Sequence, residues 1–365
     1  MPLDHYRPLG RSGLLVSPLS LGTMTFGVAR WGIAQPEAEA VVDAYAQAGG
    51  NVIDTADVYA SGECERMIGD ILTTRGDRDR WVVSTKSGFA MGRGPSSGGN
   101  GAKAMHNAVE GSLRRLRTDH IDLYWAHVWD SVTPPEEMLE TMSGLVRSGK
   151  IRYWGLSNTP AWYAARVVTL AAARGLPGPV ALQNFYSLAS RDIEAEHVPL
   201  ALDTGLGVVP WSPLAYGLLS GKYDRATVEA GPSRAGGLPN QAAGDDGERG
   251  DRLDGANPFG DMLFTERNWS IVEAVKALAA EIGEPPAKVA LAWVLGRPAV
   301  CTTLTGVSRV SQLQENIAAI DLRLTDDQLA RLDAATTPAL PMLYGLFSDQ
   351  MRQHVVFGGA RVSAA

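Results

Sequence analysis

The sequence alternates short β-branched runs with longer amphipathic stretches, and this alternation occurs eight times. The runs expected to be strands are residues 19–23, 51–54, 81–86, 121–127, 151–158, 180–184, 207–212 and 300–306. We expect a helix after each strand; the first begins at Pro36 and has an apolar face at helical spacing. Strands that alternate with helices form a parallel sheet. Eight such units in one chain predict a closed (β/α)8 TIM barrel of the α/β class.

An open doubly wound sheet is the structural alternative. Such sheets usually carry a glycine-rich dinucleotide fingerprint, G-x-G-x-x-G, after the first strand. The corresponding segment here is "LGTMTFG" at 21–27, which does not match. The sequence therefore favours the barrel, preceded by an N-terminal β-hairpin made of "YRPLG" and "GLLVSPL".

Two segments are additional to the plain barrel, which we otherwise expect to be one domain spanning residues 1–365. Residues 221–262 form a long loop after the seventh strand, rich in Gly, Pro and Asp. Loops of this length inside a compact domain are uncommon and often serve as lids or are disordered. Residues 336–365 form a C-terminal tail containing "PALPMLYGLFSDQMRQHVVFGG". Because this tail is rich in apolar residues, we expect it to pack back on the barrel.

Composition excludes several classes of protein. The net charge of −7 argues against general affinity for nucleic acid or anionic membranes. Apolar runs of membrane-spanning length are missing, as is a signal-peptide core, so we expect a cytoplasmic protein. Cys64 and Cys301 give no disulfide framework and are interpreted as buried thiols. The six histidines are scattered without metal-ligand spacing, so no metal site is expected.

Polar and aromatic residues gather where the predicted strands end. Active sites of such barrels lie at the C-terminal ends of the strands. The residues found there are Asp54 with Tyr59 on the following loop, Lys86, His127, Ser157, Asn158, Gln183, Asn184, Trp211, Ser212, Gly306 and Ser308. Taken singly, an aspartate can cap a helix, a tyrosine can pack, a lysine can be solvated and a histidine can be a satisfied core residue. Their convergence from adjacent strand ends favours catalysis.

An acid, a phenol, an ammonium and an imidazole together support proton donation to a carbonyl oxygen. A free tyrosine has a pKa of about 10, which is high for an acid working near pH 7. We expect Lys86 to lower the pKa of Tyr59 and Asp54 to hold Lys86 in its charged form. His127 can orient the carbonyl by a hydrogen bond. This set supplies no reductant, so a hydride donor must bind beside it.

These residues resemble the motifs of the aldo-keto reductase superfamily, and the resemblance covers nearly the whole chain. The matching segments run from "PLGRSGLLVSPLSLGTMTFG" through "NVIDTADVY", "STK", "YWAHVWD", "GLSN", "LQNFYS" and "PWSPLAYGLLSGKY" to "GVSRVSQLQENI". The resemblance implies a catalytic tetrad of Asp54, Tyr59, Lys86 and His127. It also implies a nicotinamide dinucleotide cofactor, usually NADPH, with NAD less common.

The resemblance assigns further residues to the cofactor. Ser157, Asn158 and Gln183 would hold the carboxamide, and Trp211 would stack on the nicotinamide, although an inward-packing tryptophan is the alternative. The remaining assignments are Thr23, Ser212, Pro213, Leu214, Gly306, Ser308, Gln312, Glu315 and Asn316. A phosphate would lie at the start of the last helix. Arg309 would add a charge-assisted bond there or is a surface arginine. Lys222 and Arg234 resemble basic residues of relatives of potassium-channel β subunits, but a Gly-rich insertion follows Arg234 and departs from that pattern.

The implied activity is NADPH-dependent reduction of aldehydes or ketones to alcohols, with Tyr59 as the proton donor. One alternative is a nucleotide-binding regulatory or redox-sensing subunit. Another is a sugar or alcohol dehydrogenase running in the oxidative direction, since the tetrad supports both directions. Trp31 and Trp129 are the candidates for the substrate pocket. The expected partner is a small carbonyl substrate; nucleic acid and membrane are not expected, and nothing in the sequence indicates an oligomer.

Overall fold

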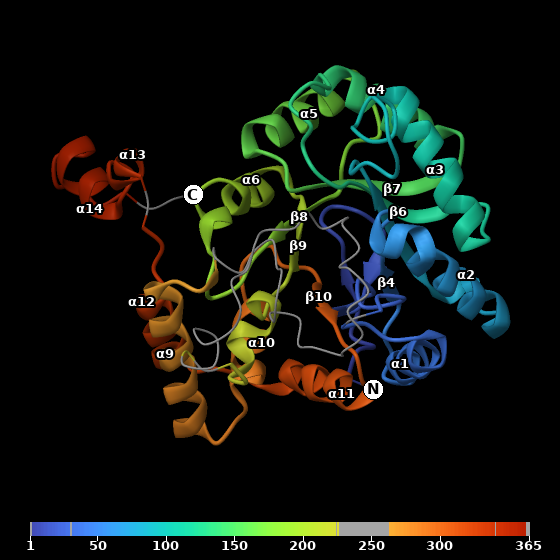
Figure 1. The fold of residues 1–365 in the computed structure, drawn as a ribbon. Helices are drawn as coiled ribbons and strands as arrows, with labels where there is room; N and C mark the ends of the chain where they lie inside the picture. Colours follow the sequence, from blue (N-terminus) through green and yellow to red (C-terminus); the bar gives the residue numbers. More distant parts are fainter. Residues whose placement is uncertain (1, 30, 224, 226–262, 340, 363–365) are drawn as a thin grey trace.

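A computed structural model describes residues 2–29, 31–223, 225, 263–339 and 341–362. At its centre is a parallel sheet of eight strands in the order β10, β3, β4, β5, β6, β7, β8, β9 (Figure 1). The strands are β3 (Leu19–Gly22), β4 (Val52–Asp54), β5 (Val82–Ser87), β6 (Ile121–Ala126), β7 (Ile151–Ser157), β8 (Ala181–Phe185), β9 (Gly207–Trp211) and β10 (Thr303–Gly306). Val208 forms a parallel bridge with Val300 and brings the two edges of the sheet together. The predicted (β/α)8 TIM barrel is confirmed.

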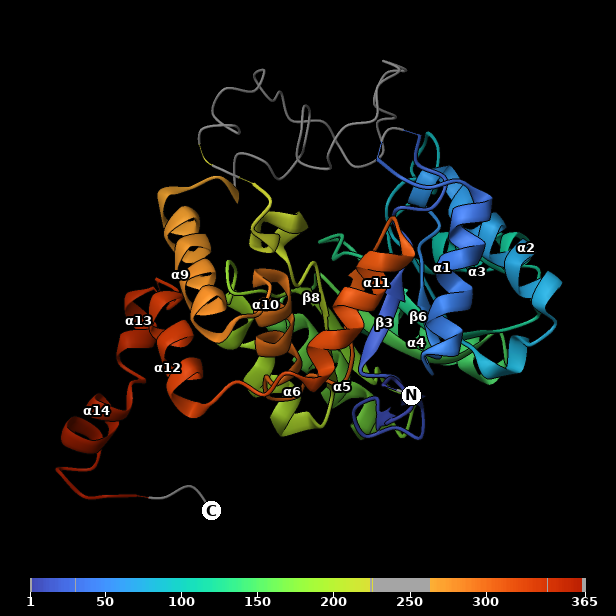
Figure 2. The same ribbon diagram turned by 90° about the horizontal axis from the view of Figure 1, so that it is seen from below.

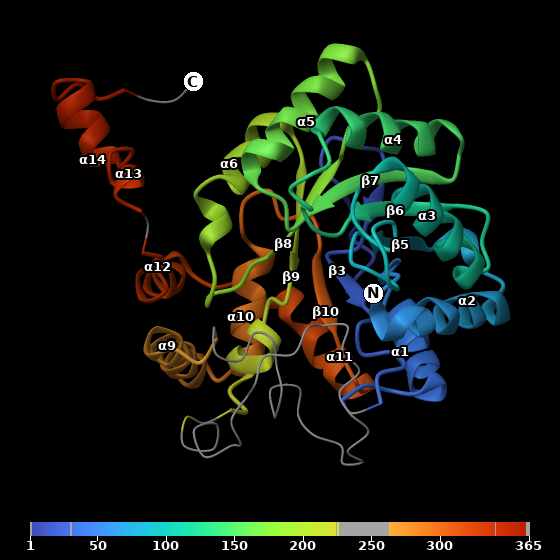
Figure 3. The ribbon, with the colours of Figure 1, turned by 45° about the horizontal axis from the view of Figure 1, so that its top comes forward.

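Helices surround the outer face of this sheet (Figures 1 and 3). They are α1 (Gln35–Gln47), α2 (Glu63–Arg75), α3 (Ala102–Leu116), α4 (Pro135–Arg147), α5 (Ala161–Arg174), α6 (His197–Thr204), α9 (Glu266–Ile282), α10 (Pro286–Leu295), α11 (Val310–Ile317) and α12 (Asp326–Ala335). Proline stands in the first turn of α1, α4 and α10, where its fixed φ fits the helix and its missing N–H is not needed. The buried residues of α4, at three- and four-residue spacing, form the face that covers the sheet.

The inside of the barrel is a separate hydrophobic core. Residues from the strands meet there, namely Val52, Val82, Leu123, Trp125, Ala181, Val209 and Leu304. Leu9 and Val16 belong to the same cluster and come from the N-terminal hairpin of β1 (Arg7–Pro8) and β2 (Leu15–Val16). The hairpin therefore closes one end of the barrel and leaves the other end, where the strands terminate, for the site.

Among the described helices that surround the barrel, α9, α10 and α12 were not predicted from the sequence. Helices α9 and α10 lie between β9 and β10, and α12 follows α11. Their boundaries carry ordinary signals: Thr265 caps the start of α9 with its side chain, and Gly283 ends it in the left-handed conformation. Most of the predicted loop 221–262, with Arg234, lies outside the described residues. Cys64 is buried as expected, but Cys301 is only partly buried, which corrects the interpretation of it as a buried thiol. None of the helices that the structure describes has the length and apolar character to cross a membrane.

From Pro341 onward, the C-terminal tail does not pack on the barrel as the sequence suggested. It contains α13 (Met342–Gly345), α14 (Asp349–Met351) and a π-helical turn, η6 (Arg352–Val356). In all three ribbon views α14 stands outside the ring of helices (Figures 1 to 3). Large apolar side chains along the tail are exposed, among them Met342, Phe347 and Val355. The expectation is wrong for these side chains, because an apolar composition does not say which surface will cover it.

Gly155 is required where β7 passes Trp125. A Cβ at residue 155 would overlap the Trp125 ring and lie 2.7 Å from the Ala181 carbonyl oxygen. We predict that Gly155→Ala lowers the free energy of unfolding by about 1–3 kcal/mol, the usual cost of overpacking a core. Urea denaturation measures this. Gly144→Ala is the matched control, because Gly144 lies in α4 with open space around it, and alanine there should stabilise by up to about 1 kcal/mol. Equal effects of the two substitutions would contradict the account.

Candidate active site

The strand register brings the predicted tetrad together at the C-terminal end of the barrel. Asp54 ends β4 and lies opposite Ser84 of β5. Lys86 lies two residues further along β5, and His127 follows β6, with its backbone N–H donating to the Ser87 carbonyl oxygen at 2.8 Å. Tyr59 is the first residue of the short helix η1 (Tyr59–Gly62), which follows β4.

A buried ion pair forms the base of the site. The Lys86 ammonium contacts the Asp54 carboxylate and also donates to the Thr55 carbonyl oxygen at 2.7 Å. The two side chains are only 1% and 3% exposed. Ser84 Oγ donates to Asp54 Oδ1 at 2.8 Å, and Trp125 Nε1 donates to Ser84 Oγ at 2.7 Å. Burial of such a pair is costly unless its remaining hydrogen-bonding atoms have partners, and this network provides them.

Lys86 also touches Tyr59. Its Nζ lies 3.5 Å from the Tyr59 hydroxyl oxygen and 5.1 Å from the centre of the ring. Burial lowers the pKa of Lys86, but the Asp54 carboxylate and Tyr59 outweigh it and leave that pKa raised overall. Lys86 therefore carries its charge at neutral pH beside the phenol.

The pKa of Tyr59 differs from the sequence-based expectation. Burial raises the pKa of Tyr59, the Lys86 ammonium lowers it, and the outcome is a pKa above the ordinary tyrosine value. The expected lowering by Lys86 is present but is the smaller effect, because a phenolate loses more by leaving water than it gains from one ammonium that is already paired with Asp54. Tyr59 is consequently a protonated hydrogen-bond donor at neutral pH.

His127 faces Tyr59 and Phe89. Its ring centre lies 6.0 Å from that of Tyr59 and 4.6 Å from that of Phe89, edge-on in both cases. Burial, and then the Lys86 charge, hold the pKa of His127 well below its usual value, so the imidazole is neutral. Its Nδ1 is buried and has no hydrogen-bond partner within the described residues. The sequence analysis missed Phe89; its place three residues after Lys86, on a strand-end loop, is the signal that could have found it.

The residues expected to hold a carboxamide lie side by side, because Ser157 at the end of β7 is paired with Gln183 of β8. Asn158 Nδ2 donates to Ser157 Oγ at 3.0 Å and to the His127 carbonyl oxygen at 2.9 Å. Trp211 Nε1 donates to Asn158 Oδ1 at 3.1 Å. Asn158 has a left-handed backbone with φ of 48°, which its short polar side chain tolerates. Gln183 Nε2 donates to Asp54 Oδ1 at 3.3 Å, so this group is joined directly to the ion pair.

The loop after β9 has an unusual backbone. Ser212, Ala215 and Tyr216 have φ of 50°, 48° and 58°, values that residues other than glycine seldom adopt. Such conformations persist where the surrounding structure enforces them, and they cluster at ligand-binding loops. Pro213 and Leu214 lie within this segment. Trp211, immediately before it, packs edge-on against Phe185 with ring centres 4.8 Å apart. Phe185 thus holds the Trp211 ring, whose face was expected to stack on the nicotinamide.

The segment from β10 into α11 contains the remaining cofactor candidates. Gly306 ends β10 and is exposed. Gln312 Oε1 accepts from the backbone N–H of Ser308 at 2.9 Å and lies 3.0 Å from its hydroxyl. Arg309 precedes α11 and is exposed, and no side chain caps the start of that helix. Further along α11, Glu315 is exposed and Asn316 is buried. A helix start with uncapped N–H groups and an adjacent arginine suits an anion.

The other predicted residues are placed as follows. Thr23 is fully buried and its hydroxyl already donates to the Asp54 carbonyl oxygen at 2.9 Å. Lys222 is exposed, with Nζ 4.6 Å from the centre of the Tyr223 ring. Trp129 packs against Trp162 with ring centres 5.8 Å apart. Trp31 is half-buried in the segment between β3 and α1. Within the part of the chain that the structure describes, no group of three or more His, Cys, Asp or Glu side chains could hold a metal ion.

A second acidic cluster lies behind the tetrad and was not predicted. Glu65 of α2 is fully buried, and its carboxylate accepts from Arg115 Nε and from Thr85 Oγ1, both at 2.6 Å. Asp57 is also buried; its backbone N–H donates to the Lys86 carbonyl oxygen at 3.0 Å, but its Oδ1 has no partner among the described residues. Burial, and then the Glu65 charge, raise the pKa of Asp57 to about 8. Asp57 is therefore protonated at neutral pH.

Comparison with known proteins gives one consistent result. Residues 18–337 match the model of the aldo/keto reductase family. The chain is 35% identical over 338 residues to the uncharacterized oxidoreductase YrpG of Bacillus subtilis, covering 90% of this chain and 95% of that protein. It is 34% identical over 334 residues to a probable voltage-gated potassium channel subunit beta of Oryza sativa (90% and 96%). It is 31% identical over 375 residues to an aryl-alcohol dehydrogenase [NADP(+)] of Phanerodontia chrysosporium (98% and 92%).

Asp57 makes stability depend on pH. The folded pKa of about 8 lies above the ordinary value of 3.8, so the folded state binds the proton more tightly and stability falls as pH rises from about 4 to about 8. Asp57→Asn removes this loss. We predict that the free energy of unfolding of the variant, relative to that of the wild type, rises by up to about 1.4 kcal/mol per pH unit across that window. Urea denaturation at several pH values measures this difference. Parallel pH dependences of the two proteins would contradict the assignment.

Proposed function

The chain belongs to the aldo/keto reductase family, and from that premise we propose that it reduces aldehyde or ketone carbonyls to alcohols with NADPH. The observation that carries this proposal is the buried Asp54–Lys86 ion pair beneath the Tyr59 hydroxyl, with a neutral His127 beside it. A site of this kind donates a proton to an oxygen on which negative charge develops. The oxidoreductase names among the relatives support the same reaction class.

The residues at the ends of β7 to β10 fit a nicotinamide dinucleotide. Ser157, Asn158 and Gln183 offer a hydroxyl and two amides to a carboxamide, and Trp211 offers an aromatic face. The loop from Ser212 and the start of α11 would hold the phosphates. The cofactor site would also include Thr23, which bonds the Asp54 carbonyl oxygen, and three residues of α11, namely Gln312, Glu315 and Asn316. Lys222 would lie at the edge of the site. When bound, the nicotinamide supplies the hydride for the carbonyl carbon.

Tyr59 would give its proton to the carbonyl oxygen as that oxygen becomes negative. The raised pKa keeps the phenol protonated at neutral pH, so the donor is ready before the reaction. Once the proton has left, the Lys86 ammonium 3.5 Å away stabilises the phenolate. Asp54 keeps that ammonium charged and in position. Tyr59 would therefore donate the proton, Lys86 would stabilise the phenolate and Asp54 would anchor Lys86.

His127 would orient the substrate. Its buried Nδ1 has no partner in the described structure, and a buried N–H without an acceptor is rarer than a buried acceptor without a donor. The neutral ring would thus carry its proton on Nε2, which can donate to the carbonyl oxygen. Phe89, packed edge-on against this ring, would exclude water from the same point, and Trp129 and Trp31 would line the approach.

The preference for NADPH over NADH is the finer part of the proposal. An exposed arginine, Arg309, stands at the uncapped start of α11, where a phosphate would gain both the helix N–H groups and a cation. One relative carries NADP(+) in its name. These observations support the phosphorylated nucleotide. The same groups can also oxidise an alcohol by the reverse reaction. The direction of the reaction would be determined by which form of the cofactor, reduced or oxidised, is supplied.

The similarity to a potassium channel subunit keeps a nucleotide-binding regulatory role as the second candidate. A regulatory subunit would bind the nucleotide and turn over slowly on every carbonyl. The contacts of Lys86 with both Asp54 and Tyr59 favour the reductase, because a protein that only bound nucleotide would have no need of a proton donor set above a buried ion pair.

Tyr59→Phe tests the proposal. We predict that the variant still binds NADPH, seen as quenching of tryptophan fluorescence, but loses about 10²–10⁴-fold in kcat on aldehydes. The rate is followed as loss of NADPH absorbance. Tyr6→Phe removes a hydroxyl that only bonds the Gly49 carbonyl oxygen, and it serves as the matched control.

Three other outcomes would count against the proposal. Undiminished turnover by Tyr59→Phe would exclude it as the proton donor. Binding without turnover in the wild type across aldehydes and ketones would favour the regulatory candidate. Tighter binding of NADH than of NADPH would contradict the cofactor preference.

A further inference from the structure

Exposed apolar side chains are concentrated in the segment 341–362, called here the apolar tail. Fourteen large hydrophobic side chains are exposed in the described residues, and eight of them lie in this segment. They are Met342, Leu343, Leu346, Phe347, Val355, Val356, Phe357 and Val362. Scattered exposed apolar residues are normal, but a group of this size marks a surface that another molecule covers.

The apolar tail lies beyond the residues that match the family model. The family match ends at residue 337. The hydrogen bond that joins the side chains of the tail and the barrel in the described structure runs from the Tyr344 hydroxyl to the Glu196 carboxylate. Other side-chain bonds of the tail are internal, such as the pair of Arg352 with Asp349. The tail is therefore tethered beside the barrel without being packed into it.

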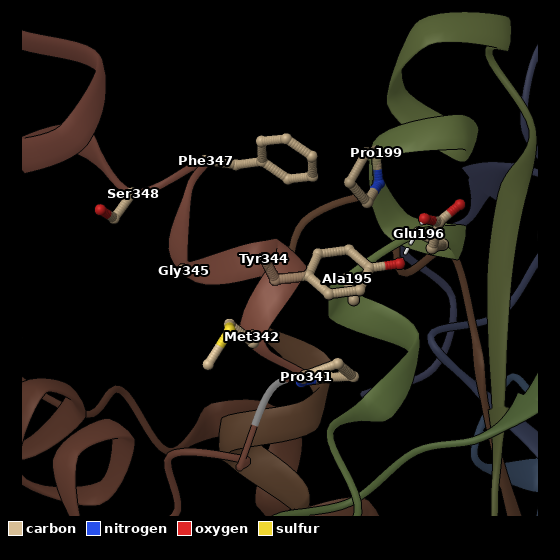
Figure 4. A pocket seen from close by; sticks show the side chains of 9 residues that line it. All are labelled: Ala195, Glu196, Pro199, Pro341, Met342, Tyr344, Gly345, Phe347 and Ser348. Carbon is tan, nitrogen blue, oxygen red and sulfur yellow. Dashed lines mark hydrogen bonds between the residues drawn. The ribbon is translucent and has the colours of Figure 1, made fainter. Parts of the chain in front are cut away.

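A cleft separates the tail from α6. It has a volume of about 620 Å³ and is lined by Ala195, Glu196 and Pro199 on the barrel side and by Pro341, Met342, Tyr344, Gly345, Phe347 and Ser348 on the tail side. Figure 4 shows the rings of Tyr344 and Phe347 directed toward α6, with Pro199 on the opposite wall. Leu202, one turn further along α6, is also exposed. The barrel wall and the tail wall of the cleft thus both present apolar groups, and contact between them within one chain leaves these groups uncovered.

The exposed area is enough for a stable association. A phenylalanine side chain buries roughly 150–250 Å². Two of the eight exposed side chains are phenylalanines and the other six are smaller, so at exposures between 43% for Phe357 and 92% for Met342 they present roughly 700 Å² in total, from the low end of that range. The largest apolar patch of a typical monomer is about 300–600 Å². A stable interface needs about 800 Å² from each partner, which this segment can supply together with the exposed Pro199 and Leu202 of α6.

We propose that the apolar tail docks on a second copy of this chain. In a two-fold dimer some of the exposed apolar side chains of each tail would enter the cleft between α6 and the tail of the other protomer, so that the same surface serves both sides of the contact. The cleft suits this occupant because one of its walls is the tail itself. A different protein would need one surface that fits both the cleft and the exposed apolar side chains of the tail. A second copy of this chain carries both a cleft and a tail, so each protomer can cover the apolar side chains of the other.

Charge supports the same arrangement. The whole chain has a net charge of −7, so two copies repel each other in general. The apolar tail, however, carries Arg352, which is paired with Asp349, and a second arginine, Arg361, which leaves the segment with a net charge of +1. The surface around α6 carries the exposed acids Asp192, Glu196 and Asp203. Tail-to-α6 contact between protomers therefore brings opposite charges together at the rim of an apolar centre, as in protein–protein interfaces generally.

Sedimentation equilibrium of the full-length protein tests the proposal. We expect a dimer of twice the 38.9 kDa chain mass at micromolar concentration. Phe347→Asp places a charge at the centre of the contact and should raise the dissociation constant at least about thirtyfold, the effect of losing one interface hot spot. Leu15→Asp alters a comparably exposed apolar side chain, 53% against 57%, on the N-terminal hairpin, and should leave the dimer unchanged. An unchanged far-UV circular dichroism spectrum verifies that Phe347→Asp folds, since loss of the dimer can itself lower the melting temperature.

Cross-linking separates exchange between protomers from contact within one chain. A Pro199→Cys protein is mixed with a Phe347→Cys protein and treated with a short bis-maleimide, with the wild type as background for Cys64 and Cys301. A covalent heterodimer of the two variants is the expected product. A wild type that stays monomeric at high micromolar concentration would overturn the proposal and leave the tail to another partner. A dimer indifferent to Phe347→Asp, or a dimer that gives no cross-link between variants, would overturn it by placing the interface elsewhere.

Discussion

The ion pair between Asp54 and Lys86 is the interaction on which the site depends. Two opposite charges removed from water are stable only with good geometry and with partners for their remaining atoms. The barrel provides these through Ser84 and Gln183 on Asp54 and the Thr55 carbonyl oxygen on Lys86. The same burial that makes the pair costly raises the pKa of Tyr59 and lowers that of His127. Burial therefore sets the charge state of both groups that would touch a substrate oxygen, Tyr59 and His127.

The barrel architecture explains why these groups meet. Parallel strands end on the same side, so residues distant in sequence become neighbours through register alone. Trp125 connects the inner core with the site, since its indole N–H bonds Ser84, which in turn bonds Asp54. Farther around the barrel, the indole N–H of Trp211 donates to the Asn158 side chain, whose amide in turn donates to the His127 carbonyl oxygen. Packing of the core and orientation of the polar groups are thus parts of one network.

The sequence was sufficient for the barrel and for the positions of the tetrad, because both follow from strand periodicity and from what stands at strand ends. It did not predict the direction of the Tyr59 pKa, since the degree of burial depends on side chains from several strands. The buried acids Asp57 and Glu65 were not predicted, since their burial depends on how α2 and α3 pack. The tail is the opposite case: its composition was read correctly as apolar, but composition does not identify the surface that covers it. The predicted roles of the cofactor residues and of loop 221–262 remain predictions.

A double-mutant cycle on Asp54→Asn and Lys86→Met tests the central claim most directly, with unfolding free energy and aldehyde reduction measured for each protein. The account predicts that each single variant loses about 3–5 kcal/mol, because it leaves one buried charge unpaired. The double variant should lose clearly less than the sum of the two, yet remain inactive, since the phenol then has no ammonium beside it. Strictly additive losses, or a double variant that regains activity, would contradict the claim that this pair both carries the buried charge and enables the proton donor.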